Sequence, residues 1–167
     1  VRDGIVAWLG SDAVGRAQFP GAEVTDLAGA FIAPAFVDSH VHTTATGLTL
    51  TGLDLRQATS LRDCLQLLGV YAQTHPDGMI WAHGWDESGW PERTAPSTAD
   101  IDATVGDRPA YLARVDVHSA AASTALRRRA TKLAEVAGMH DQAPLTADAH
   151  HLARRAARDG LTAQQRT

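Results

Sequence analysis

The sequence is poor in cysteine and in long hydrophobic runs. Cys64 is the only cysteine among the 167 residues, so an internal disulfide is excluded and a reducing compartment is the expected environment. No secretory signal pattern is visible, and no apolar run approaches the length of about 18 residues that a membrane-spanning helix needs. These absences favour a cytoplasmic protein and exclude a membrane-spanning helix in this sequence.

Basic charge is also scarce. The chain has 15 lysines and arginines against 19 acidic residues, which gives a net charge of −4. A chain of this balance gives no electrostatic reason to expect nucleic acid or an anionic membrane as a partner. The hydrophobic share of 44%, by contrast, is enough for a buried core in one or two small domains.

The strongest chemical signal is the run from Phe36 to His42. On a β-strand, successive side chains alternate between faces, so Asp38, His40 and His42 share one face. Two imidazoles one residue apart on one face can reach a single metal ion, and imidazole is a common ligand of zinc and similar metals. The alternative is a strand end with two half-exposed histidines.

Both ends of the sequence look cut. Asp3-Gly4 is a hairpin-turn signal, yet only two residues precede it. Residues 162–165 match a helix capping box, and the helix that this box predicts has only two further residues. We therefore expect a piece of a longer protein; frayed ends on a complete small protein are the alternative.

The hydrophobic pattern predicts strands first and alternating elements later. Before residue 60, it predicts two short strands at residues 5–9 and 23–27, joined by a loop at residues 10–22. A buried strand at residues 31–37 and a polar loop at residues 43–47 follow. After residue 60, helices and strands alternate. The pattern predicts helices at residues 61–74 and 120–130, strands at residues 79–82 and 110–115, and between these strands a short helix begun by Ser97 and Asp100. One more helix follows at residues 146–158.

Several motifs in the right order resemble a known family. Asp26-Leu27-Ala28-Gly29 followed by residues 32–42 resembles the first barrel strand of the amidohydrolase superfamily. Four further stretches resemble the branch called amidohydrolase family 3, the YtcJ-like metal-dependent hydrolases. They are Leu53-Asp54-Leu55, Gly84-Trp85-Asp86, Trp90-Pro91, and Arg114 to Ser119 leading to Ser123 and Leu126. The chain departs from the family at Ala35 and at Ala82, where glycine is usual.

This resemblance implies an α/β fold that is part of a composite β-sandwich and (β/α)8 barrel, with an α/β insertion after the first barrel strand. Residues 1–30 would belong to the small β-sandwich. Residues 31–60 would hold the first barrel strand and the loop after it. Residues 61–140 would form the insertion, and residues 141–167 a helical return toward the barrel.

The resemblance also implies a metal site. His40 and His42 match the superfamily's first two metal ligands. Asp38, on the same face, could orient one of these histidines or could be a plain strand-end carboxylate. A bound divalent metal, with zinc expected, lowers the pKa of its water to about 7 and polarises a carbonyl. A catalytic zinc site needs three protein ligands, and the family takes the others, and its proton-handling aspartate, from later strands. The chain alone is therefore expected to be inactive and to hold no catalytic residue.

The expected parent protein hydrolyses a non-peptide C–N bond of an amide, formamide or cyclic imide in a small-molecule substrate. Amidohydrolases often pair, so the resemblance allows a homodimer. Two other functions stay open. A phosphoesterase of the polymerase-and-histidinol-phosphatase type also has an early Asp-x-His-x-His-Thr, which residues 38–43 match. A non-catalytic module that binds a metal or a partner is the other.

Three further residues are candidates for substrate binding. Trp85 and Asp86 could line a pocket as an apolar wall and a polar group; the alternative is a packed tryptophan beside a carboxylate that caps a turn. His118 could reach the site, or it could bond to neighbouring backbone while Ser119 caps a helix. The remaining histidines are predicted on the surface or on a helix face: His75, His83, His140, His150 and His151.

Overall fold

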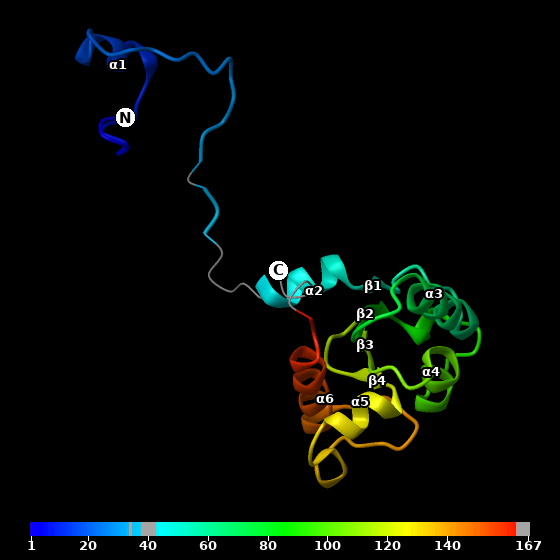
Figure 1. Ribbon diagram of the computed structural model, residues 1–167. Helices are drawn as coiled ribbons and strands as arrows, with labels where there is room; N and C mark the ends of the chain where they lie inside the picture. Colours follow the sequence, from blue (N-terminus) through cyan, green and yellow to red (C-terminus); the bar gives the residue numbers. More distant parts are fainter. Residues whose placement is uncertain (34, 38–42, 163–167) are drawn as a thin grey trace. The chain divides into compact units, whose positions relative to one another are not determined.

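The computed structural model describes residues 1–33, 35–37 and 43–162, and the chain divides into two units. We call Val1–Ser39 the N-terminal unit and His40–Thr167 the α/β unit (Figure 1). The domain boundaries predicted at residues 30, 60 and 140 stay predictions.

The N-terminal unit has little secondary structure among its described residues. It holds the helix α1, Asp12–Gln18, and one bridge between Arg2 and Ile5. The predicted strands at residues 5–9 and 23–27 are wrong for this structure, and the predicted loop at residues 10–22 contains α1. The predicted buried strand at residues 31–37 is also wrong for its described residues, which are exposed and belong to no strand. A strand needs a neighbouring strand for its backbone N–H and C=O groups, and the described part of this unit offers only that one bridge.

A four-stranded sheet forms the centre of the α/β unit. The strands are β1 (Leu53–Asp54), β2 (Ile80–Trp85), β3 (Ala110–Arg114) and β4 (Ala120–Ala122), in the order β1-β2-β3-β4. The first three run parallel and β4 is antiparallel to β3. All six residues of β2 are buried, as expected for the inside of a covered parallel sheet.

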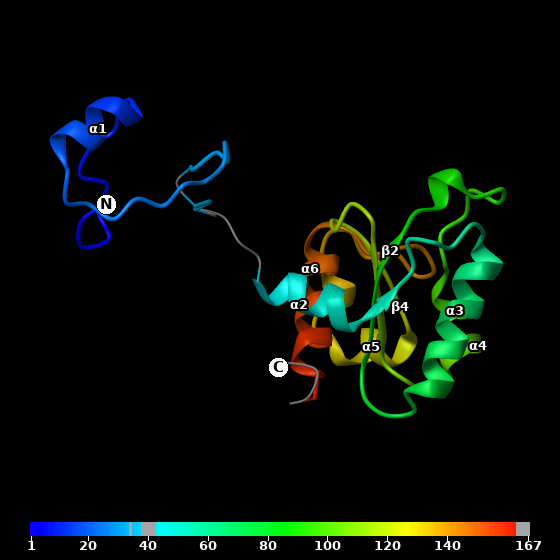
Figure 2. The ribbon, with the colours of Figure 1, turned by 90° about the horizontal axis from the view of Figure 1, so that it is seen from above.

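Helices cover both faces of this sheet (Figure 2). The helices α3 (Leu61–Thr74) and α4 (Thr98–Val105) share one hydrophobic cluster with one face. The helices α2 (Thr43–Thr51), α5 (Thr124–Arg129) and α6 (Ala147–Asp159) pack on the other. Two short 3₁₀ turns complete the described elements, at Glu87–Gly89 and Leu133–Glu135.

Capping side chains fix where the helices begin. The Ser60 hydroxyl accepts from the Asp63 N–H at the start of α3, and Ser97 forms a full capping box with Asp100 at the start of α4. The start of α4 at Ser97 and Asp100 is a confirmed sequence prediction. Thr146 precedes α6 as predicted, but its side chain makes no capping bond.

Two predicted elements change. The predicted helix at residues 120–130 is instead the strand β4 followed by α5, because Ala120–Ala122 pair with Tyr111–Ala113 and Ser123 then caps the helix. The predicted polar loop at residues 43–47 is the first half of α2. Alanine favours a helix, so at residues 120–122 the pairing with β3 overrides the local propensity.

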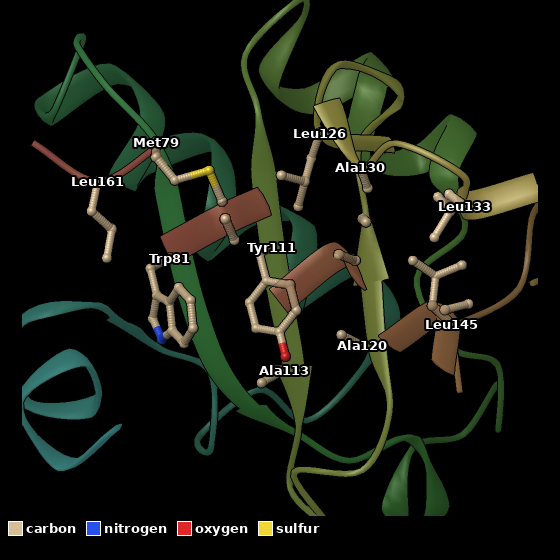
Figure 3. Packing of buried hydrophobic residues seen from close by; sticks show 14 of the residues in the cluster. Met79, Trp81, Tyr111, Ala113, Ala120, Leu126, Ala130, Leu133, Leu145 and Leu161 are labelled. Carbon is tan, nitrogen blue, oxygen red and sulfur yellow. The ribbon is translucent and has the colours of Figure 1, made fainter. Parts of the chain in front are cut away.

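Figure 3 shows the cluster on the α6 side of the sheet, where Trp81 and Tyr111 project from neighbouring strands. Their ring centroids lie 4.7 Å apart. His150 of α6 is buried here, and its Nε2 lies 2.7 Å from the Tyr111 hydroxyl oxygen. Of the two predicted positions, the surface is wrong and the helix face is confirmed: α6 turns His150 toward the sheet, where the Tyr111 hydroxyl gives it a partner.

Leu68 and Val70 make a matched pair on α3 for testing the other cluster. Leu68 is fully buried, whereas Val70 is 55% exposed. Leu68→Ala should lower the free energy of unfolding by about 2–5 kcal/mol, because it removes buried methyl groups and leaves a cavity. Val70→Ala should change it by less than about 0.5 kcal/mol. Urea unfolding of the 167-residue chain measures both, and equal effects would contradict the assigned faces of α3.

The buried His150 predicts a pH dependence of stability. Burial, with the charges of His151, Arg154 and His118, lowers the pKa of His150 to about 4 from 6.5, opposed by Asp116. Below pH 6.5 the unfolded chain takes up a proton that the folded chain refuses until about pH 4.

The free energy of unfolding should therefore have its full value above about pH 6.5 with respect to His150. It should fall by up to about 3 kcal/mol between pH 6.5 and 4. Urea unfolding across this range measures the slope. His150→Gln should flatten it, whereas the exposed His75→Gln should not, and a slope that survives in the His150 variant would contradict the assignment.

Candidate functional site

The candidate residues gather where the three parallel strands end. Asp54 ends β1, Asp86 follows β2, and Arg114 ends β3. In open α/β sheets, ligands bind at the carboxyl ends of the strands. We call this end of the sheet, together with the loops at residues 86–90 and 115–119, the carboxyl edge.

Arg114 joins the two loops of the carboxyl edge. Its guanidinium contacts three carboxylates: Nε lies 2.8 Å from Glu87 Oε2, one terminal nitrogen 2.9 Å from Asp116 Oδ2, and the other 3.3 Å from Asp86 Oδ1. The guanidinium carbon also lies 5.9 Å from the centre of the Trp85 ring. One cation thus holds the ends of β2 and β3 together.

Trp85 belongs to the core between the sheet and α3 and α4. Its ring is completely buried, its indole N–H donates to the Leu112 carbonyl at 2.8 Å, and it lies beside Trp90. This is the packed alternative considered from the sequence. Contact of Trp85 with a substrate stays a prediction.

Asp86 is a half-exposed carboxylate that caps a turn. Its Oδ1 accepts from the Ser88 N–H at 3.1 Å, at the start of the Glu87–Gly89 turn. The hydrogen bonds from Ser88 lower the pKa of Asp86, and the charge of Arg114 adds to this. An ionised carboxylate at the carboxyl edge fits the predicted substrate contact, which no described ligand tests.

His118 is exposed on the loop after β3. Asp116 Oδ1 accepts from the backbone N–H groups of His118 and Ser119, at 2.9 and 3.2 Å. Burial alone would raise the pKa of Asp116, but these bonds and Arg114 outweigh it and lower the pKa. The Ser119 hydroxyl also bonds to Asp116, so the alternative in which Ser119 caps a helix is wrong; Ser123 has that role.

The predicted metal residues lie outside the described part of the chain. Asp38, His40 and His42 belong to the undescribed residues 38–42, so their shared face stays a prediction. Among the described residues, no three histidine, cysteine, aspartate or glutamate side chains come together as a metal site would require. The chemistry of the donor set, two imidazoles, fits a zinc-type metal.

His83 is the residue that the sequence analysis missed. The sequence predicts it on the surface or on a helix face, but it lies inside β2 and is only 8% exposed. Its Nε2 is buried and has no hydrogen-bond partner among the described residues. The signal was its place in the run from Met79 to Trp85, which is otherwise apolar or small, so that a strand buried on both faces had to bury His83 too.

Val117 gives a test of the loop that carries His118. Its φ is +56°, a conformation that strains a β-branched residue. Val117→Gly should therefore stabilise the chain slightly, because the relief of about 1–2 kcal/mol exceeds the entropy cost of glycine, about 0.5–1 kcal/mol.

Val115 is the matched control, since it is exposed to a similar extent in the same loop and is absent from the positive-φ residues. Val115→Gly should destabilise the chain by about 0.5–1 kcal/mol. Thermal melting measures both, and a destabilising Val117→Gly would contradict the strained loop.

Comparisons with known proteins place this segment in a family. The profile described as amidohydrolase family matches residues 23–167. The chain is 30% identical over 128 residues to YtcJ of Bacillus subtilis (strain 168), whose name assigns it to the amidohydrolases, covering 75% of this chain and 24% of YtcJ. It is 28% identical over 126 residues to LONG AFTER FAR-RED 3 of Arabidopsis thaliana, covering 74% and 21%.

Solved structures agree with this similarity. An uncharacterized metal-dependent hydrolase from Pyrococcus horikoshii OT3 matches 99% of this chain, with a TM-score of 0.62 and 26% identity. One from Pyrococcus furiosus matches 92%, with a TM-score of 0.60 and 27% identity. The chain covers 33% and 31% of these two proteins.

The chain thus spans about a quarter of the curated relatives and a third of the solved structures. Among the described residues, no helix is both long and apolar enough to cross a membrane. The mixed α/β fold with its four-stranded sheet is similar to part of a metal-dependent hydrolase. On the profile match over residues 23–167, this chain belongs to the amidohydrolase family.

Proposed function

We propose that the parent protein is a metal-dependent hydrolase that cleaves a non-peptide C–N bond of an amide, formamide or cyclic imide. The observation that carries this proposal is the match of almost the whole chain to a metal-dependent hydrolase, together with the family. The substrate is a small molecule, and neither nucleic acid nor a membrane is a partner. The protein acts in the cytoplasm, and a homodimer is compatible with this function.

The proposed architecture is a β-sandwich beside a (β/α)8 barrel, with residues 61–140 as an α/β insertion after the first barrel strand. The N-terminal unit supports it. Its described residues include exposed apolar side chains at Phe31, Ile32, Phe36 and Val37, as expected of a strand whose neighbours lie elsewhere in the parent protein.

The chain's own contribution to the metal site is His40 and His42, with Asp38 orienting one imidazole. A bound divalent metal, with zinc proposed, supplies a water of pKa about 7 and polarises the carbonyl under attack. Since two ligands are fewer than a catalytic zinc site uses, the remaining ligands and the group that handles the proton come from the rest of the parent protein. The chain alone is therefore inactive.

Metal content and activity of the full-length protein test this function. His40→Ala/His42→Ala should lose the bound metal, measured by elemental analysis. It should also lose at least about a thousandfold in kcat on 4-nitroformanilide and 4-nitroacetanilide, because metal assistance contributes several kcal/mol. Asp38→Asn should weaken metal binding by about 10–100-fold.

The control is a double substitution of two exposed histidines, His75→Ala/His140→Ala, which should keep both metal and activity. Full metal content in the His40/His42 variant would contradict the proposed ligands. Hydrolysis of 4-nitrophenyl phosphate in place of the anilides would instead favour the phosphoesterase alternative, and metal binding without any hydrolysis would favour a non-catalytic module.

A further inference from the structure

His83 presents a hydrogen-bonding atom that nothing in the described structure uses. It is more than nine-tenths buried, and its Nε2 has no partner. An unpaired buried polar group costs about 1–3 kcal/mol, and such groups in native proteins call for an explanation. A leucine of similar size would fill the same place without this cost.

The position of His83 is where ligands bind in folds of this class. It lies near the carboxyl end of β2, which pairs in parallel with β1 on one side and β3 on the other. Side chains two residues apart on a strand share a face, so His83 lies on the face of Trp81. That face also packs Leu48 of α2, the helix that begins directly after His42 in the sequence.

The charges around His83 are already paired with one another. Asp54, its register partner on β1, is bound by the Arg56 guanidinium at 2.6 Å. Hydrogen bonding by Arg56 lowers the pKa of Asp54 to about 2, and the nearby His83 adds a smaller effect in the same direction.

An ionic ligand at His83 would therefore have to displace the ion pair of Asp54 and Arg56, whereas an uncharged polar ligand would not. The imidazole Nε2 either donates or accepts one hydrogen bond, depending on the tautomer. An amide offers a carbonyl oxygen to a donating Nε2 and an N–H to an accepting one. An amide group thus suits His83 in either state.

We propose that His83 is a substrate-positioning residue, whose Nε2 hydrogen-bonds to the uncharged amide group of the substrate at the carboxyl edge. This inference rests on the proposed function, since it takes the substrate class from it. Nε2 is buried, so the side chains that cover it must move aside when the amide binds.

The test measures binding of acetanilide to the metal-free full-length protein by calorimetry, so that binding is separated from metal chemistry and turnover. His83→Leu should raise the Kd about tenfold, the value of one hydrogen bond. His83→Gln, which can place its amide nitrogen near the Nε2 position, should keep the Kd within about threefold. His83→Asn is too short to do so and should lose affinity as the leucine variant does.

Thermal melting of the same variants separates positioning from packing. Removing a buried atom without a partner should leave the melting temperature of His83→Leu equal or higher. The exposed His75→Leu is the control for both measurements and should leave the Kd unchanged. An unchanged Kd in both the leucine and asparagine variants overturns the proposal, and so does a wild-type protein that does not bind acetanilide.

This outcome is independent of the metal test. Loss of acetanilide binding in the His83 variants, with metal retained in the His40/His42 variant, would keep the positioning role and reject the proposed metal ligands. The reverse pattern would keep the metal-dependent hydrolase and reject the role of His83.

Discussion

The parallel pairing of β2 with β3 is the interaction on which the rest of the α/β unit depends. Every residue of β2 is buried, so its backbone groups must find partners in the neighbouring strands. That pairing aligns Ile80 with Ala110 at one end and His83 with Ala113 near the other. It divides the apolar side chains into two clusters, one under α3 and α4 and one under α5 and α6. It also brings the ends of both strands to one edge, where Arg114 connects their loops.

The elements that the sequence predicts well are those whose signals are local. The helix at residues 61–74 has its full apolar stripe and its own cap, and the capping box at Ser97 lies within four residues of sequence. The element at residues 120–122 is different. Three alanines become a strand because Tyr111 and its neighbours lie opposite them, and this information is not local. The predicted strands of the N-terminal unit differ from its structure for the same reason.

The residues of the candidate site also differ in whether a local sequence signal predicts their role. Trp85, Asp86 and the loop around His118 could be singled out by motif, but motif alone left their roles open, and the structure gives Trp85 a place in the core. The burial of His83 and His150 was not predicted, because the histidine residue type does not itself indicate a buried position. One became buried through the strand that carries it, the other through the hydroxyl of Tyr111 opposite it. The metal-ligand prediction at His40 and His42 rests on the motif and on the family.

The exposed apolar side chains of the N-terminal unit have a consequence for handling the protein. Phe31, Ile32, Phe36 and Val37 lie within seven residues, and each leaves most of its surface open to solvent. A contiguous apolar stretch of this kind promotes self-association when it has no partner. During synthesis this stretch leaves the ribosome before the sheet of the α/β unit exists, so it is exposed throughout the folding of that unit.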